Sequence, residues 1–142
     1  MAVTSERRNA GLPGNVPFQR VVIVEDEGVL RRIVARNLRA RGFEVIEAAT
    51  AEDAIRAALT LAPDLMLLDI NLPDRTGWDV LRVLRERQVE VPTIVVSAVR
   101  IPACRLDEFK PLAYLPKPFP LDSLLSLVVG FVPLSDASAE RL

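Results

Sequence analysis

Apolar residues along this chain form short runs that are separated by longer amphipathic stretches. Five runs are apolar or β-branched almost throughout and predict strands: Val21–Val24, Phe43–Ala48, Leu65–Leu68, Thr93–Val96 and Leu112–Leu115. After each of the first three runs, apolar residues recur at helical spacing, and a last helix is predicted over Pro120–Phe131. Between the fourth and fifth runs, Pro102 and Pro111 leave room for only a short or distorted helix.

The alternation of strands and helices indicates the fold class. Strands that are apolar throughout are buried on both faces, so the pattern predicts an α/β fold, with a doubly wound parallel sheet of five strands and helices on both faces. Thr50 and Thr76 are each followed three positions later by Asp and are predicted N-caps. Gly42 is predicted to end the first helix in a left-handed conformation.

Length and composition bound the domain organisation. The chain has 142 residues, enough for one domain. We expect a mobile N-terminal arm over 1–19, a folded domain over 20–132 and a C-terminal tail over 133–142, with no output domain after the last helix. The N-terminus has no apolar core of a secretory signal, and no stretch is apolar enough to span a membrane. The single cysteine, Cys104, excludes an internal disulfide and suits a reducing, cytoplasmic location.

Charge and residue usage exclude several kinds of chemistry and partner. The net charge is −1 and there is no long basic run, which argues against binding to nucleic acid or to a membrane surface. The sequence contains no histidine, so histidine-dependent nucleophilic catalysis and histidine-ligated zinc are excluded. Any chemistry must therefore use carboxylates, hydroxyls, lysine or arginine.

Charged and hydroxyl residues follow the predicted strands at positions that should meet. In an open α/β sheet, ligands bind beyond the carboxyl ends of the strands. The residues at these ends are Glu25, Asp26, Asp69, Ser97 and Lys117. Three converging acids repel each other unless a cation is present, and oxygen ligands favour Mg²⁺. Such a site suits stabilisation of a phosphoryl group, with one acid as its acceptor.

At these residues the chain resembles the receiver domain of two-component response regulators, of the CheY-like superfamily. The matching segments are VVIVEDE (21–27), LMLLDINLPDRTGWDVL (65–81), TIVVSA (93–98) and AYLPKPF (113–119). The resemblance implies a flavodoxin-like fold with strand order 2-1-3-4-5. It also implies a partner that donates the phosphoryl group, namely a histidine kinase or a histidine phosphotransfer protein. The acyl phosphate would be hydrolysed slowly on the domain itself, and the domain would not be an enzyme.

The same resemblance implies a role for each site residue. Asp69 would be the phosphoacceptor, with Ser97 and Lys117 contacting the phosphoryl group. Mg²⁺ would be bound by Asp26, Asp69 and the backbone carbonyl of Asn71, with Glu25 helping through water. Tyr114 would be a switch residue that moves with Ser97, and a cis peptide bond would precede Pro118.

Several alternatives stay open from the sequence alone. Ser97 and Lys117 lie 20 positions apart, fewer than is usual in receiver domains, so a phosphorylation-independent interaction module on the same fold is the competing hypothesis. Tyr114 lies in an apolar strand, for which a core residue is the safer interpretation. Arginines along the first helix form either a solvated face or a docking surface for a phosphodonor. Apolar residues beyond the core face of the last helix suggest a homodimer through that helix. Trp78 receives no role.

Overall fold

A computed structural model describes residues 19–131 of the chain, in which five parallel strands alternate with helices. The strands are β1 (Arg20–Val24), β2 (Glu44–Ala48), β3 (Leu65–Asp69), β4 (Thr93–Ser97) and β5 (Ala113–Pro116). The helices are α2 (Gly28–Ala40), α3 (Ala51–Leu61), α4 (Gly77–Glu86), α5 (Ala103–Phe109) and α6 (Leu121–Phe131). The strand order is β2-β1-β3-β4-β5, which confirms the predicted topology.

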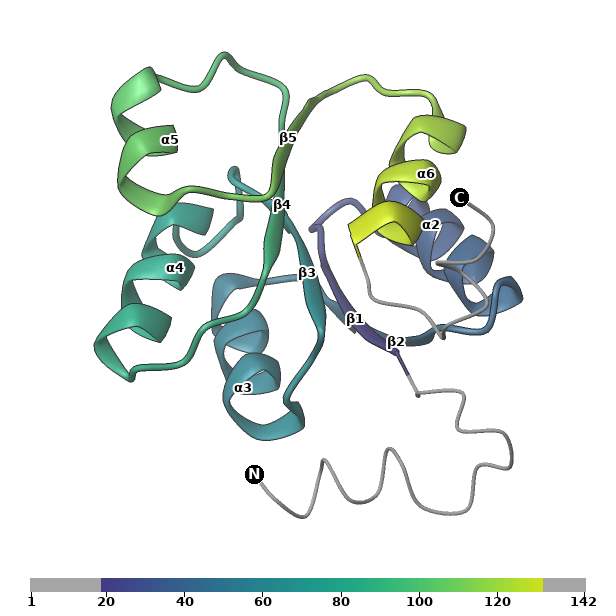
Figure 1. The fold of residues 1–142 in the computed structure, drawn as a ribbon, viewed down its shortest axis with the longest axis horizontal. Helices are drawn as coiled ribbons and strands as arrows, with labels where there is room; N and C mark the ends of the chain where they lie inside the picture. Colours follow the sequence, from purple (N-terminus) through teal and green to yellow (C-terminus); the bar gives the residue numbers. More distant parts are fainter. Residues whose placement is uncertain (1–18, 132–142) are drawn as a thin grey trace.

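The helices cover both faces of the sheet (Figure 1). On one face, α2 and α6 pack over a core that includes Val34, Leu38 and Leu124. On the other face, α3 and α4 pack over a second core with Ala54 and Leu84, and α5 continues this layer toward β5. The predicted doubly wound arrangement is therefore confirmed, and it leaves the two ends of the strands free of covering helices.

The three central strands are buried at every position, as their uninterrupted apolar runs predicted. Burying each Leu, Ile or Val side chain contributes about 1.5–3 kcal/mol, so these strands form the most stabilising part of the core. β5 is different, because it lies at the edge of the sheet and is only half-buried. It is also displaced by one residue from the prediction, starting at Ala113 and ending at Pro116.

Local sequence signals set the helix ends. The side chains of Thr50 and Thr76 accept hydrogen bonds from the N–H groups of Asp53 and Asp79, at 3.0 and 3.3 Å, so both are N-caps as predicted. Gly42 has φ +94°, a conformation that glycine adopts without strain. These caps place the start of each helix beside the carboxyl end of the preceding strand.

Helix α5 is short, as the prolines predicted, with seven residues and no buried side chain. Phe109 and Leu106 pack against the small core that contains Trp78, and the Phe109 ring stacks on Trp78 with 5.3 Å between the centroids. The Arg85 guanidinium lies 4.8 Å from the same ring and also donates a 2.7 Å hydrogen bond to the Glu108 carbonyl. Trp78 itself is buried and belongs to the small core cluster against which α5 packs.

The predicted arm and tail fall largely outside the described residues. The arm boundary at residue 19 and the tail over 133–142 stay predictions, although Gln19 is buried and its carbonyl accepts a hydrogen bond from the Glu44 N–H at 2.8 Å. Within residues 19–131, every helix is too short or too polar to cross a membrane.

Candidate functional site

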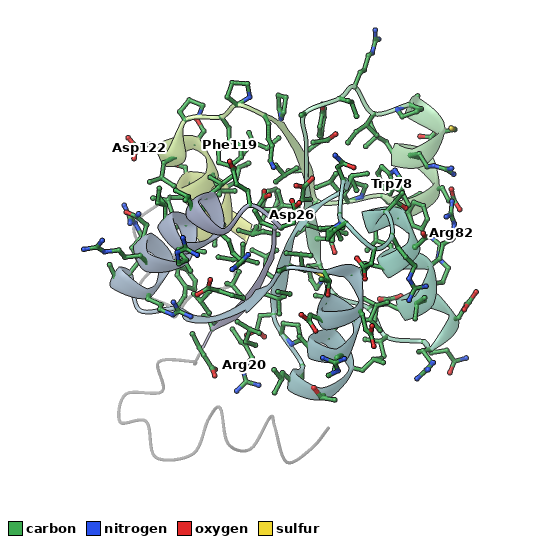
Figure 2. The ribbon with its side chains drawn as sticks, turned by 180° about the vertical axis from the view of Figure 1, so that it is seen from behind. Arg20, Asp26, Trp78, Arg82, Phe119 and Asp122 are labelled. Atoms are coloured by element: carbon green, nitrogen blue, oxygen red, sulfur yellow. The ribbon has the colours of Figure 1, made fainter. Side chains whose placement is uncertain are left out.

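Three carboxylates meet at the carboxyl edge of the sheet. Glu25 and Asp26 follow β1, and Asp69 is the last residue of β3, the neighbouring strand. One oxygen atom from each lies within 4.8 Å of the others. Glu25 and Asp69 are only 5% and 4% exposed, whereas Asp26 is exposed to solvent. In Figure 2, Asp26 and Arg20 mark the two opposite ends of β1, so the acids lie far from the edge where the strands begin.

Lys117 brings a positive charge to this cluster. It follows β5, two strands away from β3, and its backbone N–H donates a 2.8 Å hydrogen bond to the Ser97 carbonyl. Its Nζ atom lies 2.6 Å from Glu25 Oε1 and 2.9 Å from Asp69 Oδ2. The peptide bond between Lys117 and Pro118 is cis, as the resemblance implied. One ammonium group therefore joins the two buried carboxylates.

Burial and pairing act in opposite directions on the charged groups. Burial raises the pKa of Glu25 above its ordinary value, and hydrogen bonds from Lys117 and from the Glu27 N–H offset only part of this effect. For Lys117, burial alone would lower the pKa, but hydrogen bonds to Glu25 and Asp69 outweigh it, so the pKa is raised. Lys117 thus keeps its charge through the physiological pH range.

Asp69 is held by contacts to both of its carboxylate oxygens. Oδ1 accepts a 3.0 Å hydrogen bond from the Asn71 N–H, and Oδ2 accepts the bond from Lys117. Asn71 lies in the loop between β3 and α4, where it pairs with Thr76 in an isolated antiparallel bridge. Thr76 acts as the cap of α4, as predicted, and the loop holds the Asn71 backbone directly beside the Asp69 carboxylate.

Ser97 and Tyr114 share one hydrogen-bond acceptor, the Val99 carbonyl. The Ser97 hydroxyl donates a 2.8 Å hydrogen bond to the Val99 carbonyl and accepts one from the Val99 N–H at 3.1 Å. The half-buried Tyr114 hydroxyl donates to the same carbonyl at 3.3 Å. Ser97 is therefore at the expected edge, but its hydroxyl is engaged within its own turn. The sequence could not predict the role of the Val99 carbonyl, because every residue has a backbone carbonyl and the residue type does not show which one accepts a hydrogen bond.

The donor set fits a hard divalent cation. Carboxylate and carbonyl oxygens are the ligands that Mg²⁺ takes in proteins, and the cluster contains no softer donor. A bound cation would also reduce the repulsion among three acids of which Lys117 contacts only two. Chemically, the edge of the sheet offers a nucleophilic carboxylate, an ammonium group and a cation site around one point.

Comparisons with known proteins point to one family. The family model described as the response regulator receiver domain matches residues 21–129. The transcriptional regulatory protein KdpE of Mycobacterium tuberculosis is 37% identical over 122 residues, which are 84% of this chain and 54% of KdpE. The chain thus spans about half the length of this relative.

Two solved structures show the same fold. The signal receiver domain of a LuxO repressor protein from Vibrio parahaemolyticus has a TM-score of 0.75 and 25% identity, over 87% of this chain and 95% of that one. The response regulator TrrA from Thermotoga maritima, solved in complex with Mg²⁺ and BeF, has a TM-score of 0.68 and 26% identity, over 78% and 96%. The chain belongs to the response regulator receiver domain family of two-component signalling.

Proposed function

We propose that this receiver domain accepts a phosphoryl group on Asp69 from the phosphohistidine of a histidine kinase or a histidine phosphotransfer protein. The observation that carries the proposal is the convergence of Lys117, Glu25 and Asp26 on the Asp69 carboxylate. Three clustered acids with one shared lysine are costly to maintain in a domain that only needs to fold, because the charges repel. A phosphoacceptor site explains why the three acids and the lysine lie together.

The transfer replaces one bond to phosphorus with another. An Asp69 carboxylate oxygen attacks the phosphorus atom, the P–O bond forms, and the P–N bond breaks with its electron pair staying on the imidazole nitrogen. Lys117 lies 2.9 Å from the Asp69 carboxylate, close enough for its ammonium to stabilise the charge on the phosphoryl oxygens. The product is an acyl phosphate, which we expect to hydrolyse slowly in place, so the domain is not assigned an enzymatic turnover.

Mg²⁺ is the cofactor that the donor set supports. The Asp26 and Asp69 carboxylates and the Asn71 carbonyl would hold it, with Glu25 acting through water. When bound, it supplies positive charge to the phosphoryl oxygens during transfer. The structure of TrrA in complex with Mg²⁺ and BeF supports this assignment for a related fold.

The phosphorylated state would be read out through Ser97 and Tyr114. Both hydroxyls donate to the Val99 carbonyl in the unmodified domain. Turning the Ser97 hydroxyl toward a phosphoryl oxygen on Asp69 would remove one donor from this carbonyl and favour a closer approach of Tyr114. We propose that this exchange couples the site to β5 and to the segment that follows it.

The first helix offers a surface for the phosphodonor. Val29 and Ile33 are 61% and 45% exposed, one helical turn apart, and line a shallow hollow with three arginines and one acid: Arg32, Arg36, Arg39 and Glu47. α2 begins three residues after Glu25, so a partner seated here is beside the acceptor site. We propose that this hollow, called here the α2 surface, binds an acidic, partly apolar surface of the donor protein.

The proposal extends to a second copy of the chain, to the cellular location and to nucleic acid. Homodimer formation through α6 stays a prediction, supported by the exposed Phe131 side chain at the end of that helix. A cytoplasmic location is part of the proposal, since the phosphodonors act there. KdpE is named a transcriptional regulatory protein and is about twice as long as the matched region. The predicted lack of nucleic-acid binding therefore concerns the receiver domain alone, and it stays a prediction.

Incubation with Mg²⁺ and acetyl phosphate, followed by intact-mass measurement, tests the phosphoacceptor role directly. The wild-type chain should gain one phosphoryl group, and Asp69→Ala should gain none. Asp107→Ala is the matched control, because it removes one exposed carboxylate from α5 and should leave the gain unchanged. A wild-type chain that gains no phosphoryl group would support the phosphorylation-independent interaction module.

A further inference from the structure

Backbone contacts hold the loop between β3 and α4 together at its two ends. The Gly77 N–H donates a 2.7 Å hydrogen bond to the Ile70 carbonyl, and Asn71 bridges Thr76. Gly77 is required there, because a Cβ atom would lie 2.8 Å from the Asp69 carbonyl oxygen. These contacts join the two ends of the loop to each other, but none of them is a hydrogen bond from the loop to a neighbouring helix, so they leave the position of the loop relative to α3 to other contacts.

Asp74 attaches the loop to α3. Its Oδ1 accepts a hydrogen bond from the Ala51 N–H at 2.8 Å, and its Oδ2 accepts one from the Glu52 N–H at 3.1 Å. Both N–H groups belong to the first turn of α3, where backbone donors have no partner within the helix. A carboxylate at this position also interacts favourably with the helix dipole.

Two loops cap the start of α3: the β2–α3 loop through Thr50 and the β3–α4 loop through Asp74. Thr50, directly before the helix, caps the Asp53 N–H, whereas the two preceding donors are satisfied from the β3–α4 loop. The hydrogen bonds from Ala51 and Glu52 hold the pKa of Asp74 below its ordinary value, so the carboxylate stays charged at neutral pH. Leu72, in the same loop, is buried against the α3 side of the core and holds the loop on that side too.

We propose that Asp74 is a positioning residue for the cation site, because its carboxylate ties the β3–α4 loop to α3 and so holds the Asn71 carbonyl in place to coordinate Mg²⁺. This inference rests on the proposed function, in which Asn71 supplies a ligand. Asp74 contacts neither the acids nor Lys117 through any hydrogen bond or ion pair found within residues 19–131, so it acts only through the loop.

A pair of cap deletions separates positioning of the loop from stabilisation of the helix. Asp74→Ala and Thr50→Ala each remove side-chain caps from the start of α3, but only Asp74 belongs to the loop. Mg²⁺ titration by calorimetry should show about tenfold weaker binding for Asp74→Ala, the range found when a group supporting a metal ligand is removed. Thr50→Ala should bind Mg²⁺ like the wild type, and Asp74→Asn, which keeps one acceptor oxygen, should lie between.

Circular dichroism melts establish that each variant is folded at the titration temperature. Equal Mg²⁺ affinity for Asp74→Ala and wild type would overturn the inference, as would an equal loss in Thr50→Ala or a wild-type chain that binds no Mg²⁺. The acetyl phosphate assay on the same samples reports separately on the proposed function. A wild type that binds Mg²⁺ without being phosphorylated would overturn that function and leave the role of Asp74 to be decided by the affinities.

Discussion

At the scale of single residues, Lys117 is the group on which the charge balance of the site depends. Sixteen of the 18 basic residues in the chain are arginine, and only Lys110 and Lys117 are lysine. The compact ammonium of Lys117 reaches one oxygen of Glu25 and one of Asp69 at the same time. A planar guanidinium, with its fixed fork of donors, is less suited to a point between two carboxylates and a phosphoryl group.

Replacing this ammonium should impair phosphorylation far more than folding. We expect Lys117→Met to slow phosphorylation by acetyl phosphate about 10²-fold, the cost of removing one group that stabilises developing charge. The rate is measured by intact mass against time at fixed Mg²⁺. Lys110→Met is the control, since it removes the other lysine, which is exposed at the end of α5. Comparable rates in Lys117→Met and wild type would show that Lys117 serves the fold alone.

At the scale of elements, α5 is the helix with the weakest attachment to the core. It has no buried side chain, and its Phe109 ring lies against Trp78 and the guanidinium groups of Arg82 and Arg85, while Leu106 packs against the same small core. Trp78 and Arg82, which are both labelled in Figure 2, belong to α4 and both contact this ring. Local opening of such an element costs much less than global unfolding.

Removing the Phe109 ring should therefore release α5 without unfolding the domain. The aromatic pair and the cation–π contacts together are worth about 1–3 kcal/mol, which corresponds to roughly fivefold to 150-fold faster amide exchange over 103–109 in Phe109→Ala. Emission from Trp78, the single tryptophan, should shift to longer wavelength as the ring becomes exposed. Arg105→Gln, which breaks only an exposed ion pair with Glu108, should change neither signal. Unchanged exchange in Phe109→Ala would place the anchor of α5 elsewhere.

The cap that Asp74 supplies to α3 also has a predictable pH dependence. Because the pKa of Asp74 is lowered in the folded state, its contribution to stability is present above the pKa of an unfolded Asp, about 3.9, and is lost as pH falls through the folded-state value. Urea unfolding without metal should show wild type more stable than Asp74→Asn near neutral pH, with the difference closing in acid. Asp107→Asn, an exposed acid on α5, is the comparison, and a difference that persists below both pKa values would contradict this account.

At the scale of the whole molecule, the sequence predicted what depends on burial and on position along the chain. The central strands are apolar at every position, so the buried parallel sheet and the gathering of Glu25, Asp69 and Lys117 at one edge followed from general rules of α/β sheets. The strand order came from the resemblance to receiver domains. Two contacts could not be predicted from the sequence. The Ser97 hydroxyl forms a local turn with Val99, one of several conformations open to serine, and the contact of Asp74 with α3 joins residues more than twenty positions apart.

The distribution of charge over the molecule suggests how a protein donor is selected. Four arginines lie on α2, and they divide into two pairs. Arg31 and Arg39 are bound to Glu47, whereas Arg32 and Arg36 form no ion pair within the described part of the chain. The unpaired arginines flank the exposed Val29 and Ile33 side chains. Positive charge beside apolar surface attracts an acidic partner and speeds its association, so the α2 surface should matter for protein donors and not for small ones.

Reversal of one of these charges separates the two kinds of donor. Arg36→Glu should slow phosphotransfer from a phosphorylated histidine kinase that modifies the wild type by several-fold, and the difference should shrink at high salt, because exposed charges are screened. Phosphorylation by acetyl phosphate should be unchanged, since Arg36 makes no contact with the carboxylates. Arg87→Glu makes the same charge reversal at the end of α4 and should leave both rates unchanged. If both variants slowed the kinase reaction equally, the effect would come from net charge and the α2 surface would not be the docking site; if acetyl phosphate also reacted slowly with Arg36→Glu, the substitution would have disturbed the acceptor site itself.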